Sequence, residues 1–114
     1  MDKPKVYCAY DEMVDITKLV PNPRNPNQHS DRQIELLAKI IKHQGWRVPI
    51  TVSKRSGFVV RGHGRLLAAQ LLGLDEVPVD YQDYASEAEE WADLIADNRL
   101  AELSQMDNQL LKDL

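Results

Sequence analysis

The clearest periodic pattern of the chain lies between Ser30 and Gly45. Apolar residues recur there at helical spacing, at Ile34, Leu37, Ala38 and Ile41. Ser30 and Gln33 form a capping box at the start of this run, and Gly45 supplies a left-handed stop at its end. The pattern predicts a helix over residues 31–44.

Two runs rich in β-branched residues follow this helix. Residues 50–54 and 58–61 both have the composition of strands, and Arg55-Ser-Gly57 separates them as a turn. The two runs are therefore predicted to pair as a hairpin. A further strand is predicted over residues 77–81.

The segment that precedes the helix has a weaker pattern. From Met13 to Val20, apolar and polar positions alternate imperfectly. The chain then enters Pro21–Asn27, where three prolines lack the N–H donors that a strand ladder needs. The sequence predicts a short strand followed by an extended polar loop.

Glycine marks the junction between the hairpin and the next helical run. Gly62-His-Gly-Arg65 leads directly from strand 58–61 into the apolar run 66–72, which Gly73 closes. This order predicts a strand, a glycine turn and a helix. The turn is the first candidate for a functional site.

The last part of the chain is helical in pattern. Ser86 and Glu89 form a second capping box, which opens a helix. One face of that helix is apolar, at Ala88, Trp91, Ala92 and Ile95. A separate last helix is predicted to begin near Asp107, with apolar positions at Leu110, Leu111 and Leu114.

These elements predict an α+β protein in which a small mixed β-sheet packs with helices, followed by a helical C-terminal region. The 114 residues, 43% of them hydrophobic and 28% charged, suit one soluble domain. We expect a single domain over residues 1–114, with a core at about 13–100 and a helical extension at 101–114.

The charges are distributed unevenly around a net charge of −4. Residues 1–65 carry 12 Lys and Arg against 6 Asp and Glu, whereas residues 66–114 carry 2 against 12. Two interpretations stay open. In one, the first half forms a basic face for phosphates; in the other, the acidic half simply keeps the C-terminal helices in solvent.

Several classes of protein are disfavoured by the composition. Cys8 has no partner for an internal disulfide, and no Cys/His cluster has the spacing of a zinc site. No apolar run is long enough to cross a membrane. We therefore expect a cytoplasmic protein without structural zinc or a membrane anchor, and we interpret Cys8 as an incidental thiol.

The glycine turn has the design of an anion site. Glycines let the backbone approach a ligand, and the free amides and dipole of a helix N-terminus favour negative charge. Arg61 and Arg65 add positive charge, and His63 adds a group that titrates near neutral pH. The alternative is a plain structural turn. His63 is a candidate general acid or base, but no serine, cysteine or carboxylate beside it in the sequence forms a dyad with it.

Two other segments carry groups suited to a nucleotide. Asp97 and Asn98 place oxygen ligands next to each other near the end of a predicted helix, where they suit Mg²⁺ held against substrate phosphates. The proline loop carries Arg24 among several amide side chains, and it is either a lid over a nucleotide or a surface crossing. An exposed helix end with ordinary caps is the alternative for Asp97-Asn98.

The order of motifs along the chain is more specific than any one of them. It runs Leu19-Val-Pro-Asn-Pro-Arg-Asn25, Pro49-Ile50, Val60-Arg-Gly-His-Gly-Arg-Leu-Leu-Ala-Ala69, Val77-Pro-Val79 and Ala96-Asp-Asn-Arg-Leu100. In this order the motifs resemble the ParB-like domains associated with phage and plasmid DNA methyltransferases, within the ParB/sulfiredoxin superfamily. The resemblance covers about residues 13–114.

The resemblance implies a nucleotide site. In the superfamily the corresponding turn cradles nucleotide phosphates, of CTP in partition ParB proteins and of ATP in sulfiredoxin and a free-serine kinase. Gly62, His63, Gly64 and Arg65 are thereby the implied phosphate site, with Arg61 and Arg24 beside it. Asp97-Asn98 resembles the acidic residue and asparagine that help to hold Mg²⁺ in partition proteins.

The chain also departs from its superfamily. Partition proteins usually carry a Gly-Glu-Arg-Arg turn where this chain has Gly62-His-Gly-Arg65, which puts CTP preference and hydrolysis in question. The turn contains no cysteine, so sulfinic-acid reduction is rejected. No helix-turn-helix reading domain follows within the 114 residues.

Three functional hypotheses result. The preferred one is a nucleoside triphosphate and Mg²⁺-binding module of a DNA partition or DNA-modification system, with weak triphosphatase activity left open. The second is a DNA-binding or nuclease domain with a basic surface through Arg24, Arg32, Lys54, Arg55 and Arg61. The third is a non-catalytic assembly module that partners a DNA methyltransferase, or itself, through Leu103, Leu110, Leu111 and Leu114.

Overall fold

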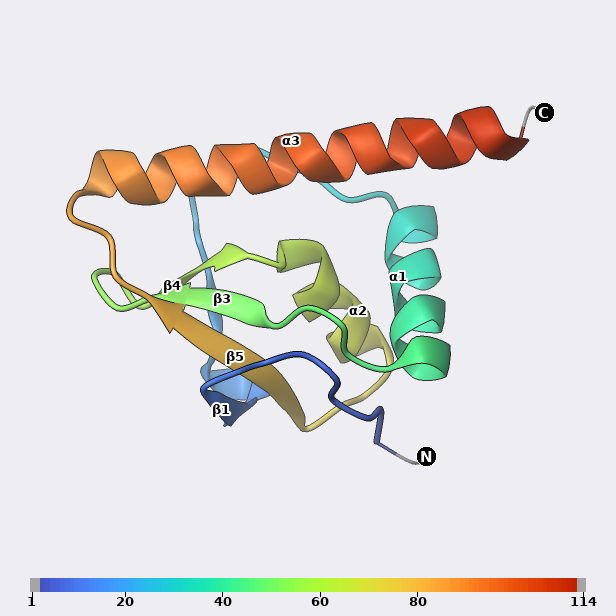
Figure 1. Ribbon diagram of the computed structural model, residues 1–114, viewed down its shortest axis with the longest axis horizontal. Coiled ribbons are helices and arrows are strands. Elements are labelled where there is room, and N and C mark those ends of the chain that lie inside the picture. Colours follow the sequence, from blue (N-terminus) through green and yellow to red (C-terminus); the bar gives the residue numbers. More distant parts are fainter. Residues whose placement is uncertain (1–2, 113–114) are drawn as a thin grey trace.

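The computed structural model describes the backbone of residues 3–112 and the side chains of residues 3–100. Figure 1 shows the arrangement of its elements. In chain order these are β1 (Glu12–Asp15), the 3-10 helix η1 (Ile16–Lys18), β2 (Val20–Pro21), α1 (Asp31–Gln44), β3 (Ile50–Ser53), β4 (Phe58–Arg61), α2 (His63–Leu71), β5 (Glu76–Gln82) and α3 (Glu87–Lys112).

The five strands form one mixed sheet in the order β1-β5-β3-β4-β2. β3 and β4 pair antiparallel, which confirms the predicted hairpin, and β5 pairs parallel to β3 and antiparallel to β1. β2 pairs parallel to β4 at the other edge of the sheet. The α+β class with a small mixed sheet is therefore confirmed.

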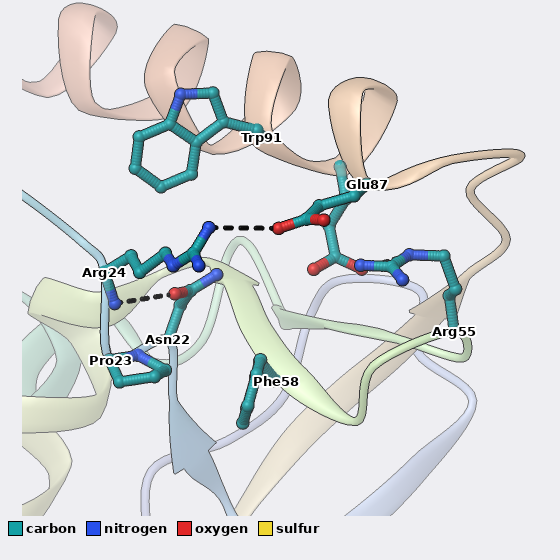
Figure 2. A pocket seen from close by; sticks show the side chains of 8 residues that line it. Asn22, Pro23, Arg24, Arg55, Phe58, Glu87 and Trp91 are labelled. Atoms are coloured by element: carbon teal, nitrogen blue, oxygen red, sulfur yellow. Dashed lines mark hydrogen bonds and ion pairs between the residues drawn. The ribbon is translucent and has the colours of Figure 1, made fainter.

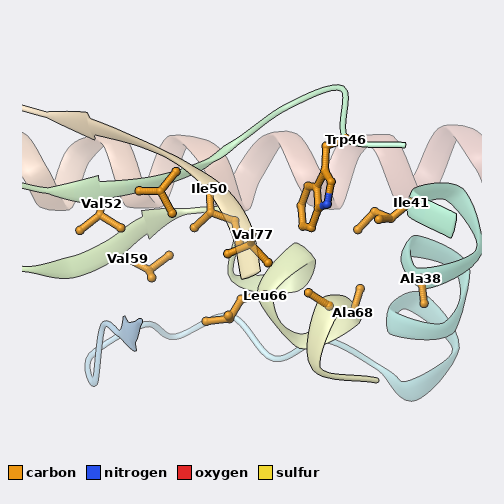
Figure 3. Packing of buried hydrophobic residues seen from close by; sticks show 11 residues of the cluster. Ala38, Ile41, Trp46, Ile50, Val52, Val59, Leu66, Ala68 and Val77 are labelled. Atoms are coloured by element: carbon orange, nitrogen blue, oxygen red, sulfur yellow. The ribbon is translucent and has the colours of Figure 1, made fainter. Parts of the chain in front are cut away.

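The core lies between the sheet and the two shorter helices (Figure 3). It combines side chains of β3, β4, β5, α1 and α2 with Trp46, which follows α1. The members from the strands and helices are Ala38, Ile41, Ile50, Val52, Val59, Leu66, Ala68, Ala69, Val77 and Val79. Successive side chains of a strand point to opposite faces of the sheet. Val60 is accordingly buried outside this cluster, as is Leu94, which places both between β4 and α3.

The helix predicted over residues 31–44 is confirmed as α1. The Ser30 hydroxyl accepts a hydrogen bond from the Gln33 amide at 3.2 Å, and the Gly45 amide donates to the Ile41 carbonyl at the other end. Both ends of this helix are thus set by local side-chain and backbone chemistry.

The short strand predicted within Met13–Val20 is confirmed as β1, but it ends at Asp15 and does not continue to Val20. The Asp15 side chain accepts hydrogen bonds from the amide and the hydroxyl of Thr17, and the chain turns into η1 there. Pairing resumes only at β2, which includes Pro21. A proline is tolerated there because β2 is an edge strand.

The separate helix predicted near Asp107 is also wrong, because α3 runs without a break from Glu87 to Lys112. The segment contains neither glycine nor proline, so nothing in it interrupts the helical hydrogen bonds. In Figure 1, α3 lies along one side of the molecule and continues past α1. The side chains of Leu103, Leu110 and Leu111, and Leu114 entirely, lie outside the described residues.

No helix within residues 3–112 combines the length and the apolar character that crossing a bilayer requires.

Candidate functional site

The N-terminus of α2 follows β4 without a loop. Gly62 caps the helix with a φ of 91°, in the left-handed region, and no side-chain hydrogen bond caps this end. A Cβ on Gly62 would also lie 3.3 Å from Cγ1 of Ile50. Helix α2 begins at His63, three residues before the predicted start at Leu66, so the predicted glycine turn is the helix's own first turn.

Gly64 is required by close packing in this first turn. A Cβ there would lie 3.0 Å from Cδ1 of Leu37 and 3.1 Å from Cε1 of His29. The residue is buried beneath the His29 ring, at the end of the proline loop. Gly64 thus lets the loop, α1 and α2 meet at one point.

The two arginines of the turn lie differently. The Arg61 Nε donates to Asp93 Oδ1 at 3.0 Å, so Arg61 faces α3. Arg65, in the first turn of α2, is half-buried. Burial raises the pKa of Cys8, and the charge of Arg65 opposes this rise only weakly.

His63 is buried, with 7% of its surface exposed. Its Nε2 accepts a hydrogen bond from the Asn22 amide at 3.2 Å, so the neutral ring carries its proton on Nδ1, which has no partner within the described residues. Burial lowers the pKa of His63, Asp97 opposes this shift, and His29 adds to it. The ring is consequently a neutral acceptor that holds the proline loop on α2.

Asp97, a residue of α3, lies at the same helix end, although it is 35 positions from Gly62 in sequence. Its Oδ2 accepts a hydrogen bond from the Gly62 amide at 3.2 Å. The structure thus brings together the implied phosphate turn and the implied metal ligand. Asp97 lies in the middle of α3, not near its end as predicted, because the helix extends to Lys112.

Asn98 faces the proline loop instead of the glycine turn. Its Nδ2 donates to Asn25 Oδ1 at 2.8 Å, and its Oδ1 accepts from Asn27 Nδ2 at 3.3 Å. The residue is 7% exposed. Both halves of the buried carboxamide are therefore used to fasten the loop to α3.

Three further carboxylates of α3 bind basic or hydroxyl groups on the neighbouring elements. Glu87 binds Arg24 at 3.2 Å, and Asp93 binds Arg61 as described above. The Glu90 carboxylate is almost fully buried, where it accepts from the Ser56 hydroxyl at 2.9 and 3.0 Å and lies 3.6 Å from Arg55 Nε. Arg24, Arg55 and Arg61 do lie along one side of α3, but each is paired with an acid.

A pocket of about 210 Å³ opens at the N-terminal end of α3 (Figure 2). Figure 2 shows Trp91 on one side and Phe58 and Pro23 on the other, with Arg24 and Arg55 facing the carboxylates of α3. Asn22 belongs both to this pocket and, through its amide, to the contact with His63. Asn22 therefore connects the pocket to the start of α2.

Sequence reasoning missed the acidic row of α3 and its partners Ser56 and Tyr84. The Tyr84 hydroxyl donates to Asp93 Oδ2 at 2.5 Å, and burial, followed by this bond, raises the pKa of Tyr84. Residues 87, 90, 93 and 97 recur at helical spacing, which places them on one face. The helical spacing of these acidic residues could be recognised in the sequence. The residues that they bind could not.

Comparison with known proteins decides the family. A family model described as the ParB N-terminal domain matches residues 5–98. The chain belongs to the ParB N-terminal domain family. A curated relative, the ParB-like nuclease domain-containing protein YnaK of Escherichia coli (strain K12), is 38% identical over 64 residues, which cover 56% of this chain and 72% of YnaK.

Solved structures agree with this ParB-type fold. The C-terminally truncated chromosome-partitioning protein ParB from Caulobacter crescentus, complexed with CTP-γ-S, matches with a TM-score of 0.65 and 27% identity over 76% of this chain. The match spans about half, 51%, of that ParB chain. Sulfiredoxin from Arabidopsis thaliana, at 22% identity, has a TM-score of 0.55 over 65% of this chain and 88% of its own, and shows the shared fold alone.

Proposed function

We propose that this ParB-type domain binds a nucleoside triphosphate, with the phosphates at the N-terminus of α2. The observation that carries the proposal is the local geometry of that helix end. It joins a left-handed glycine, a second glycine at a crowded contact and a helix start without a side-chain cap. Such an end presents backbone amides and a positive dipole to an anion.

The family supports the choice of ligand. The Caulobacter ParB structure holds CTP-γ-S, and it is similar to this chain over most of the described fold. The departure of Gly62-His-Gly-Arg65 from the usual partition turn leaves the base open, so CTP and ATP are both candidates. We place this nucleotide-dependent module in a DNA partition or DNA-modification system.

Asp97 fits a role beside Mg²⁺ in this proposal. Mg²⁺ is commonly bound by one or two carboxylates together with substrate phosphates, and the Asp97 carboxylate is within hydrogen-bonding distance of the turn. Bound Mg²⁺ would neutralise phosphate charge there. Asn98 fits that role less well, because both ends of its carboxamide are bonded to Asn25 and Asn27.

Thermal unfolding with Mg²⁺ and each of CTP, ATP, GTP and UTP tests the proposal. A ligand at about 100 times its dissociation constant should raise the free energy of unfolding by roughly 2.7 kcal/mol. We expect this stabilisation with at least one triphosphate and a much smaller one with the matching nucleoside, which lacks phosphates.

Arg65→Ala is expected to weaken the stabilisation, because it removes a cation from the first turn of α2. Arg32→Ala is the matched control, since Arg32 is an exposed arginine of α1. Equal stabilisation of wild type and Arg65→Ala would remove Arg65 from the site. The absence of stabilisation by any triphosphate would overturn the proposed function.

A further inference from the structure

The acidic face of α3 repeats a simple pattern. Its carboxylates at residues 87, 90, 93 and 97 each bind a group that suits a phosphate: the guanidinium groups of Arg24, Arg55 and Arg61, and the amide of Gly62. We call these four groups the basic strip. Every member of the basic strip is thus in contact with an anion from the same helix.

The basic strip extends beyond the N-terminus of α2, where the triphosphate of a nucleotide is proposed to bind. Residues 87 and 97 are ten positions apart, which corresponds to about 15 Å along a helix axis. Phosphates of one nucleic-acid strand follow each other at about 3.4 Å along a duplex axis, so a strip of this length would face several of them. In the structure the carboxylates of α3 contact these groups along the whole row.

The surroundings of the strip add a second feature of strand recognition. Trp91 and Phe58 line the pocket that also contains Arg24 and Arg55 (Figure 2). The Trp91 side chain is partly exposed. Aromatic side chains beside a basic groove are the combination on which the bases of single strands stack, and neither a lipid headgroup nor an acidic protein needs it.

We propose that the basic strip binds the sugar-phosphate backbone of a single nucleic-acid strand, and that the acidic face of α3 occupies the strip as an internal phosphate mimic. The arginine side chains are 77%, 38% and 48% exposed for Arg24, Arg55 and Arg61. They can therefore exchange a carboxylate for a phosphate while Leu94, a residue of α3, stays buried. This goes beyond the proposed nucleotide site, because it requires neither a nucleotide nor a metal.

The test compares two double variants that remove the same charge. Glu87→Gln with Asp93→Asn neutralises two carboxylates that bind the strip. Glu35→Gln with Asp75→Asn neutralises two exposed carboxylates on other elements. Binding of a fluorescein-labelled single-stranded DNA is measured by anisotropy at about 0.1 M salt, where charges more than about 10 Å away are largely screened. Mg²⁺ and nucleotide are left out, and circular dichroism first establishes that each variant is folded.

We expect the first double variant to bind about fivefold to tenfold more tightly than wild type, since each exposed ion pair that competes is worth up to a few-fold. The control variant should gain much less, because its charges act only at long range through a screening solution. Adding Arg24→Gln and Arg61→Gln should cancel the gain and reduce the salt dependence by about 0.7 logarithmic slope units per lost phosphate contact, the value for a single strand.

Equal gains in the two double variants would overturn the proposal, because they would show an effect of net charge alone. A gain that persists after both arginines are replaced would overturn it as well. Should the double variant fail to fold, Glu87→Gln alone supplies the test, because this carboxylate is 69% exposed and lies at the end of the row.

Discussion

The Gly62 amide donates a hydrogen bond to the Asp97 carboxylate over 3.2 Å, across 35 positions of sequence. The bond fastens the middle of α3 to the junction between β4 and α2. In the proposed site, a carboxylate of the protein is therefore bonded to one of the amides assigned to a phosphate, and the same carboxylate is the one proposed to lie beside Mg²⁺.

Asp97→Asn separates these two effects. The substitution keeps an oxygen that can accept from Gly62 but removes the charge that repels a phosphate. We expect triphosphate binding without Mg²⁺ to become several-fold tighter, and the improvement that Mg²⁺ gives to wild type to disappear. Calorimetric titration with and without Mg²⁺ measures both.

Asp83→Asn is the control for this change, because Asp83 is exposed and pairs only loosely with Lys54, at 3.7 Å. It should bind like wild type under both conditions. A wild-type response of Asp97→Asn to Mg²⁺ would exclude Asp97 as a ligand of the metal.

Because the neutral ring of His63 is buried, we expect the protein to lose stability in acid. Burial lowers its pKa below the ordinary value of 6.5, so the unfolded chain takes up a proton first as the pH falls. The contribution of the neutral ring to the free energy of unfolding is complete above pH 6.5 and is lost as the pH falls from there through the lowered pKa. Protonated Nε2 would also cease to accept from the Asn22 amide.

Urea unfolding at about pH 7.5 and about pH 5.5 measures this loss, over the range in which histidine titrates. His63→Gln should show a smaller difference between the two conditions than wild type. His43→Gln, an exposed change in the last turn of α1, should keep the wild-type difference. The same pH dependence in wild type and His63→Gln would contradict the assignment of a buried neutral ring.

The hydrogen bonds of Asn98 to the proline loop are expected to contribute to the free energy of unfolding. Asn98→Ala leaves Asn25 Oδ1 and Asn27 Nδ2 without their buried partner. We expect the free energy of unfolding to fall by about 1–3 kcal/mol. Gln28→Ala, an exposed change in the same loop, should cost less than about 0.5 kcal/mol, and an equal cost would show that the bridge is unimportant.

The parts of the fold that were predictable are those set by neighbours in sequence. Ser30 and Gln33 fix the start of α1 through one local hydrogen bond, and the turn at Arg55–Gly57 fixes the hairpin. The break after Asp15 was also local, since Asp15 binds Thr17, but the alternation of apolar residues concealed it. The continuity of α3 agrees with the absence of glycine and proline between Glu87 and Lys112, which the prediction of a separate helix near Asp107 did not take into account.

The sequence allowed the residues of the candidate site to be identified, but it did not allow the contacts between them to be predicted. Gly62 and Asp97 were both identified from sequence, but the bond between them depends on where α3 crosses β4. Asn98 carries the groups expected of a metal ligand, yet the loop 73 positions away uses them. Such pairings depend on the tertiary packing of segments that are distant in sequence, and no local pattern encodes that packing.

Titration of ¹⁵N-labelled protein with Mg²⁺ and a triphosphate, followed by backbone amide NMR, tests the phosphate site most directly. Gly62 and Gly64 should shift, because their amides belong to the start of α2, while Gly57 and Gly73, which lie in exposed turns, should not. Saturable shifts of Gly62 and Gly64 would establish phosphates at this helix end. Shifts confined to other amides, or none at millimolar triphosphate, would contradict the account.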